Sequence, residues 1–243
     1  MKNAIITTYY CNGCPKPSKE ECKQRFAYDV DSEDFYINFS DDFDPFNYSN
    51  IPNVGISKRK DLVFGKIFRL RKFIENNILG KYDNILHIDY SDTKFARSSV
   101  ELFEDFTSSG EDIIISTEKN CWPYLETVSQ WFDNKLEPKE FYYVNSGAVI
   151  SKVEKFYEVI IKLEEICLST NIDFWDDQGV WQYYSVKENN IKKDEVSKYF
   201  FSTSELDETY YKLENKIITT KFGTEPFLIH DNSSFSLNLT KKI

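Results

Sequence analysis

Two aspartates and a histidine, each at the end of a short apolar run, are the side chains of this sequence best suited to chemistry. Asp89 and Asp92 form a D-x-x-D just after residues 84–88 (NILHI), and His230 ends a second apolar run at residues 226–230 (PFLIH). Carboxylate oxygens are hard ligands that suit Mg²⁺ or Mn²⁺, and an added imidazole favours Mn²⁺. Acidic pairs are also common in surface turns, and a lone histidine often only forms a hydrogen bond, so both interpretations stay open here.

Alternating apolar segments predict the elements that position these residues. Periodicity and composition indicate strands at residues 3–8, 35–39, 84–88, 112–116 and 226–230, and helices at residues 61–77, 97–108 and 153–169. Residues 142–151 (YYVNSGAVIS) indicate a strand, a turn at Asn145, Ser146 and Gly147, and a second strand. Strands that alternate with helices favour a largely parallel sheet covered on both faces, which binds ligands at the carboxyl ends of its strands.

Two other groups of residues flank the expected ligand edge. The first strand ends at Thr7, Thr8 and Tyr9, which are a candidate wall of the site. Lys66 belongs to a concentration of basic residues in and just before the helix at residues 61–77, and it could reach a bound phosphate. A solvated helix face explains the same charges equally well.

Length and charge limit the class of protein. With 243 residues the chain is long enough for one sizeable α/β domain, and we expect a single domain over residues 1–243. The formal net charge of -10 disfavours binding to nucleic acid or anionic lipid. No apolar run approaches the roughly 18 residues of a membrane span, and no secretory signal is apparent, so we expect a cytoplasmic protein without a membrane span. The oligomeric state stays open, with a homodimer among the assemblies considered.

Cysteines near the start of the chain raise the question of a zinc or redox site. Cys11, Cys14 and Cys22 lie close together, and the first two form a C-x-x-C. A zinc site would need a fourth ligand, and both histidines lie far along the chain. We therefore expect ordinary thiols, with at most one disulfide.

Five motifs in a fixed order carry a family resemblance. The segments ILHIDYSD, EKNCWP, YYVNSGAVIS, WDDQGVW and FLIHDNS follow one another along the chain, and the likeness extends from the first strand to the last. The series resembles the glycosyltransferase domain of the procollagen lysyl hydroxylase and collagen galactosyltransferase group. Members of that group show an aspartate pair after a strand, then Cys-Trp-Pro, Leu-Asn-Ser-Gly, Asp-Asp-Gln and a final His-Gly-Asn-Gly. The resemblance implies a GT-A fold, a Rossmann-like α/β fold whose mixed, mainly parallel sheet is flanked by helices.

The resemblance also implies roles for individual residues. It makes Asp89, Asp92 and His230 the metal ligands, with Asp89 also near the donor ribose. It places these residues around the donor sugar and acceptor: Trp122, Asn145, Ser146, Gly147, Asp176, Asp177 and Gln178. Together with the strand-end wall, the expected donor-binding set is Thr7, Thr8, Tyr9, Lys66, Asp89, Gln178 and Asn232.

Three departures from the family pattern bear on these roles. The last motif has Asp231 in place of a glycine, which adds a charge near the diphosphate and removes the conformational freedom of glycine. The glycine-rich stretch before the donor-side lysine is reduced to Gly65 and Lys66. No ring that would stack on uracil is identified, and Phe46 and Tyr48 are candidates.

The activity implied by the resemblance is transfer of glucose or galactose from UDP-glucose or UDP-galactose to the hydroxyl of a protein or glycan acceptor. Hydroxylysine or galactosyl-hydroxylysine of a collagen-like chain is the acceptor that it suggests, and Mn²⁺ or Mg²⁺ would stabilise the departing diphosphate. Asp176 or Asp177 would act as base in an inverting reaction and would orient hydroxyls in a retaining one.

Bland readings and rival functions stay open beside this one. Asp176 and Asp177 could belong to a solvated acidic turn, and Trp122 could be a core or rim residue. The rival functions are a UDP-sugar transferase acting on a glycan, lipid or small molecule, and a catalytically silent nucleotide-sugar-binding module.

Overall fold

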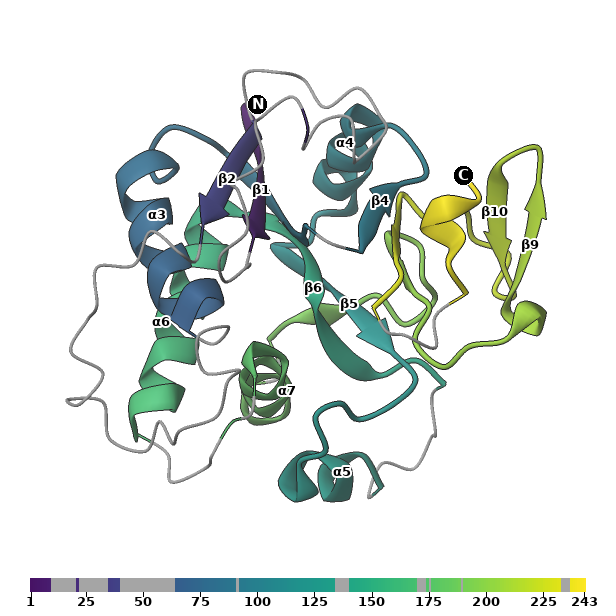
Figure 1. Cartoon of the computed structure of the whole chain (residues 1–243). Coiled ribbons are helices and arrows are strands. Elements are labelled where there is room, and N and C mark those ends of the chain that lie inside the picture. Colours follow the sequence, from purple (N-terminus) through teal and green to yellow (C-terminus); the bar gives the residue numbers. More distant parts are fainter. Residues whose placement is uncertain are drawn as a thin grey trace.

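The computed structural model describes residues 1–9, 21, 35–39, 64–90, 92–133, 140–169, 174, 176–188, 190–232 and 237–243. A six-stranded sheet of order β2-β1-β3-β6-β5-β7 forms the centre (Figure 1). Only β6 runs against the others, since it pairs antiparallel with both neighbours and the remaining pairs are parallel. The strands are β1 Asn3–Tyr9, β2 Phe35–Phe39, β3 Asn84–Asp89, β5 Ile113–Glu118, β6 Tyr143–Lys152 and β7 Lys192–Lys193. This mixed, mainly parallel sheet confirms the predicted fold class.

The predicted turn at Asn145, Ser146 and Gly147 is wrong. β6 continues through all three residues, and its register against β5 shifts between Ile115 and Thr117. An irregularity inside the strand therefore accommodates the Asn-Ser-Gly segment. Pairing with strands on both sides overrides the local turn preference of these residues.

Helices cover both faces of the central sheet. One face packs against η2 Phe64–Arg69, α3 Leu70–Asn77, α6 Val153–Ser169 and α7 Asp177–Lys187. The other face packs against α4 Ser99–Ser109 and a second sheet. The three predicted helices are confirmed where the structure describes them, although the first begins as the π-helix η2. α7 was not predicted, because it is buried on nearly every side and shows no polar stripe.

The second sheet has three strands and joins the end of the chain to its middle. It has the order β4-β11-β8, with β4 Thr93–Phe95, β8 Phe200–Ser202 and β11 Leu228–His230. A separate apolar cluster fixes this sheet to the hairpin of β9 Tyr211–Glu214 and β10 Ile217–Thr220 and to the turn η4 Leu239–Lys241. The short helix α5 Glu126–Asp133 lies beside α7.

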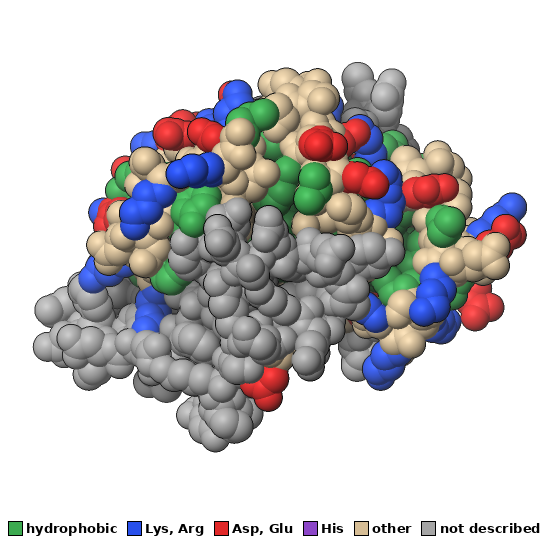
Figure 2. Space-filling view, turned by 90° about the horizontal axis from the view of Figure 1, so that it is seen from above, with side chains coloured by type: hydrophobic (Ala, Val, Ile, Leu, Met, Phe, Trp, Pro, Cys, Tyr) green, Lys and Arg blue, Asp and Glu red, His purple; other side chains and the backbone are tan. Residues whose placement is uncertain are grey.

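Charged side chains of both signs occur on the surface. Among the described side chains on the face seen in Figure 2, acidic and basic groups are interspersed rather than separated into patches. Within the described ranges, no helix is long and apolar enough to cross a bilayer. The predictions for Cys11, Cys14, Cys22, Phe46 and Tyr48 concern residues outside those ranges.

Candidate active site

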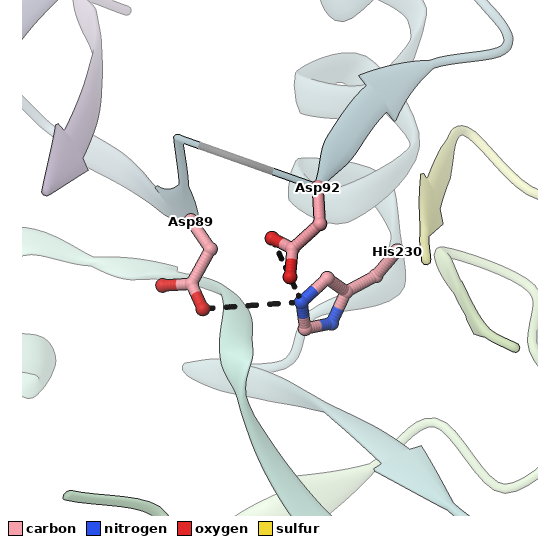
Figure 3. A group of neighbouring side chains, drawn as sticks. All are labelled: Asp89, Asp92 and His230. Carbon is pink, nitrogen blue, oxygen red and sulfur yellow. Dashed lines mark ion pairs between the residues drawn. The ribbon is translucent and has the colours of Figure 1, made fainter. Parts of the chain in front are cut away.

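The ends of three chain segments bring Asp89, Asp92 and His230 together (Figure 3). Asp89 ends β3, Asp92 comes just before β4, and His230 ends β11. Because β4 and β11 are antiparallel neighbours with Thr93 opposite His230, Asp92 lies beside the histidine. The convergence that the strand-end pattern predicts is therefore present in the fold.

The spacing of these side chains fits a divalent cation. One ligand atom from each residue lies within 4.8 Å of the other two. The Nε2 atom of His230 is 3.4 Å from Asp92 Oδ1 and 3.8 Å from Asp89 Oδ2. Ligands about 2.1 Å from one octahedral ion lie roughly 3.0 to 4.2 Å apart, so the three atoms could bind a single ion.

His230 itself is held as a metal ligand would be. Its side chain is buried, and neither ring nitrogen makes a well-aligned hydrogen bond with the described residues. An unsatisfied buried imidazole needs an explanation, and a cation supplies one. Burial alone would lower the pKa of His230, but the negative charges of Asp92, Asp89 and Glu118 outweigh burial and raise it.

Gly147 makes room for the His230 ring. A Cβ atom at position 147 would lie 2.0 Å from His230 Cε1, far inside van der Waals contact. The backbone N–H of Gly147 donates a hydrogen bond of 2.9 Å to Asn145 Oδ1, which fixes the irregular part of β6 against the ring. The Asn-Ser-Gly motif therefore contributes a surface without a side chain, on which the imidazole lies.

Lys66 joins the site as the partner of two carboxylates. Its Nζ atom lies 2.7 Å from Asp89 Oδ1 and 3.7 Å from Asp177 Oδ1, and all three side chains are largely buried. Burial alone would lower the pKa of Lys66, but Asp177 and Asp89 raise it above its usual value. Burial raises the pKa of Asp177, while Lys66 opposes that shift. Lys66 therefore neutralises part of the negative charge of Asp89 and Asp177, near the place where a cation and a phosphate would bind.

Asp176 and Asp177 have different environments despite being neighbours. Asp176 is the N-cap of α7, and its side-chain oxygen accepts a hydrogen bond of 3.1 Å from the backbone N–H of Gly179. N-cap carboxylates stabilise the first turn of a helix. Asp177 instead faces Lys66, so it is the member of the pair that the fold brings to the site.

Glu118, the last residue of β5, was not among the predicted site residues. Its carboxylate accepts hydrogen bonds from three side-chain amides, which belong to Asn145, Gln178 and Asn232. Burial raises the pKa of Glu118 to about 7, against the opposing effect of these bonds. An acid at the end of a buried strand was the available signal, the same one that drew attention to Asp89.

Comparisons with known proteins identify the family of the chain. A protein-family profile described as the PLOD GT domain matches residues 64–241. The chain belongs to the PLOD glycosyltransferase-domain family. Procollagen-lysine,2-oxoglutarate 5-dioxygenase from Drosophila melanogaster is 31% identical over 77 residues, which is 32% of this chain but only 10% of that protein.

A solved structure shows the same fold. The crystal structure of a glycosyltransferase involved in the glycosylation of the major capsid of PBCV-1 aligns with 100% of this chain and 98% of its own, with a TM-score of 0.55 and 11% identity. At that identity the likeness concerns the fold alone. The PLOD-type domain thus has the GT-A architecture that its strand order indicates.

The remaining predicted residues of the PLOD-type domain lie around this centre. Thr7 is buried in β1, and Thr8 is the register partner of Asp89, so the end of β1 lies beside the aspartate. Tyr9 ends the same strand. Trp122 is 49% exposed, and its carbonyl accepts hydrogen bonds from the side-chain amides of Gln178 and Gln182.

Asp231, the residue in place of a glycine in the last motif, is held by local hydrogen bonds. Its carboxylate accepts hydrogen bonds from Thr203 Oγ1 at 2.7 Å and from the backbone N–H and hydroxyl of Thr240. Local hydrogen bonds therefore orient both oxygens of Asp231, and its charge near the diphosphate stays a prediction.

Proposed function

We propose that this chain transfers glucose or galactose from a UDP-sugar to an acceptor hydroxyl, with Mn²⁺ or Mg²⁺ bound by Asp89, Asp92 and His230. The observation that carries the proposal is the convergence of these three side chains within 4.8 Å at the ends of separate strands. Membership of the PLOD glycosyltransferase-domain family supports the reaction class.

The positions of the residues around the proposed metal site suggest their roles in the reaction. When bound, the cation would act as a Lewis acid toward the charge of the departing diphosphate. Lys66 can exchange one carboxylate partner for a phosphate oxygen, because its ammonium lies between Asp89 and Asp177. Thr7, Thr8 and Tyr9 form the wall on the β1 side, next to Asp89.

The sugar-facing part of the site is built from amides and carboxylates. Asn145, Gln178 and Asn232 are oriented by Glu118, and their remaining hydrogen-bonding capacity suits sugar hydroxyls. Asp177 is the carboxylate that would orient a donor hydroxyl or accept a proton, since Asp176 caps α7. The exposed face of Trp122 is suited to stacking on an acceptor.

The acceptor that we propose is hydroxylysine, or galactosyl-hydroxylysine, in a collagen-like chain. The support is the name of the Drosophila relative, a procollagen-lysine dioxygenase. A glycan, lipid or small-molecule acceptor is the alternative, and a silent nucleotide-sugar-binding module is the second alternative.

Calorimetric titration with UDP tests the proposal. We expect UDP to bind in the presence of Mn²⁺ and to lose affinity in EDTA, and we expect Asp92→Asn to weaken the Mn²⁺-dependent binding by at least about 100-fold. Asp105→Asn is the matched control, because Asp105 lies on α4 and pairs with Lys198. Absence of UDP binding in Mn²⁺, or equal binding in EDTA, would refute the metal-dependent reaction.

A hydrolysis screen across UDP-sugars then identifies the donor. Mn²⁺-dependent UDP binding without hydrolysis or transfer from any UDP-sugar would indicate the silent module. Transfer to hydroxylysine peptides, compared with transfer to simple glycosides and lipids, separates the acceptor alternatives.

A further inference from the structure

Asp231 follows the proposed metal ligand His230 directly, and both its backbone and its carboxylate form hydrogen bonds to other segments. It is 9% exposed, and its backbone N–H donates a hydrogen bond of 2.8 Å to the carbonyl of Asp92. The residue therefore connects the second ligand, Asp92, directly to the segment that carries the third, His230.

The carboxylate of Asp231 extends this connection to two other segments. Oδ1 accepts from Thr203 Oγ1, and the backbone N–H of Thr203 in turn donates to the carbonyl of His230 at 3.0 Å. Oδ2 accepts from the backbone N–H of Thr240 at 2.7 Å and from its hydroxyl at 2.6 Å. Both oxygens are thus engaged, and each bond leads back to the backbone beside the site.

The turn that contains Thr240 also binds β4, the strand that begins directly after Asp92. Lys94 Nζ donates a hydrogen bond of 3.2 Å to the carbonyl of Thr240, and Lys94 pairs with Ile229 across the β4–β11 ladder. Leu239 anchors the turn, since its side chain is fully buried. One turn near residue 240 therefore connects the strand that follows Asp92 with the residue that follows His230.

We infer that Asp231 is a positioning residue that sets the distance between Asp92 and His230 by binding both strands to the turn at Leu239–Lys241. The inference rests on the proposed function, since it assigns this distance a role in cation affinity. Outer groups that orient metal ligands typically contribute about 10- to 100-fold to metal affinity.

The test compares Mn²⁺ affinity with thermal stability in the full chain. Titration of Mn²⁺ followed by electron paramagnetic resonance, with and without UDP, gives the affinity, and calorimetric melting gives the stability. We expect Asp231→Ala to weaken Mn²⁺ binding about 10- to 100-fold. Asp231→Asn keeps one acceptor oxygen and should lose less, and Thr240→Val, which keeps its backbone N–H, should lose least.

Asp194→Asn is the matched control. Asp194 is as buried as Asp231 and accepts three backbone hydrogen bonds, from Lys198, Tyr199 and Phe200, but none from the metal-ligand segments. It should lower the melting temperature and leave Mn²⁺ affinity unchanged.

Each outcome decides the matter. Unchanged Mn²⁺ affinity in Asp231→Ala, or equal loss in Asp194→Asn at a similar melting temperature, overturns the positioning role while the proposed function stands. If Asp231→Ala does not fold, the same comparison is made with Asp231→Asn and Thr240→Val. A wild-type protein that binds no Mn²⁺ even with UDP overturns the proposed function, and this role with it.

Discussion

Glu118 and Asp177 are two buried carboxylates in one site, and the fold satisfies them in opposite ways. Glu118 receives three neutral amide N–H groups, whereas Asp177 faces the ammonium of Lys66. Neutral donors satisfy the oxygens without cancelling the charge, so burial still raises the pKa of Glu118 to about 7. An opposite charge offsets part of the cost of burial at Asp177, although burial still raises its pKa, and the pair depends on a partner that a ligand can attract elsewhere.

This difference separates a rigid part of the site from an exchangeable one. The amide network around Glu118 links β5, β6, α7 and the segment after β11, and it has no reason to rearrange when charge enters the site. A cation bound to Asp89 would weaken the pairing of Lys66, because the ion and the ammonium would share one carboxylate: Lys66 contacts Oδ1, and Oδ2 faces His230. We expect substitutions on the two sides to differ in how added metal affects them.

Replacing Lys66 should have the largest effect. Lys66→Met leaves Asp89 and Asp177 buried without their shared cation, which should cost about 3 to 5 kcal/mol of unfolding free energy. Mn²⁺ should restore part of this loss, because the ion replaces the missing positive charge. Denaturant unfolding with and without Mn²⁺ measures both effects.

Two further variants control this prediction. Lys198→Met removes an exposed lysine that also pairs with an aspartate, and it should cost less than about 1 kcal/mol. Lys66→Met combined with Asp177→Asn should be more stable than Lys66→Met alone. A double variant no more stable than the single one would show that Asp177 does not share the ammonium.

Truncation of Glu118 should come next. Glu118→Ala leaves amide donors of Asn145, Gln178 and Asn232 without their acceptor, at a cost of about 2 to 4 kcal/mol. Glu118→Gln keeps the shape and one acceptor and should lose less. Unlike the loss in Lys66→Met, this loss should not be restored by Mn²⁺, and recovery by the ion would remove the distinction between the two sides.

The pH dependence of stability should sharpen the comparison. Since the folded pKa of Glu118 is about 7, above its unfolded value of 4.5, the folded state binds more protons between these values. Its contribution to stability is therefore full below pH 4.5 and is lost as the pH rises toward 7, by up to about 3 kcal/mol. Glu118→Gln should lack this component. The unfolding free energy of the wild type minus that of the variant should therefore fall between pH 4.5 and pH 7. A flat difference would mean that Glu118 titrates normally.

Removal of the Trp122 ring should have the smallest effect on stability. The residue is half exposed, and the amides of Gln178 and Gln182 donate to its backbone carbonyl, which a substitution keeps. Trp122→Ala should therefore lower the unfolding free energy by only about 1 kcal/mol while raising the KM for the acceptor. An unchanged acceptor KM would argue against stacking on the ring.

The sequence predicted the fold and the convergence at Asp89 and His230 because both depend on local signals. Apolar runs predict strands, and their carboxyl ends meet at one edge of a parallel sheet. Glu118 was not singled out, although it follows an apolar run as Asp89 does, because its three amide partners come from segments that are distant in the sequence. The pairing of Lys66 with Asp177 joins distant segments and depends on how η2 packs on α7, which periodicity does not specify.

Because β6 runs in the reverse direction, it adds side chains to the ligand-binding edge of the sheet. Neighbouring strands contribute their final residues there, while β6 contributes its opening ones, so Asn145 and Gly147 reach the edge without any loop of their own. Such residues inherit the rigidity of a central strand. They also inherit its constraint, since a single inserted residue would turn every later side chain of β6 to the opposite face.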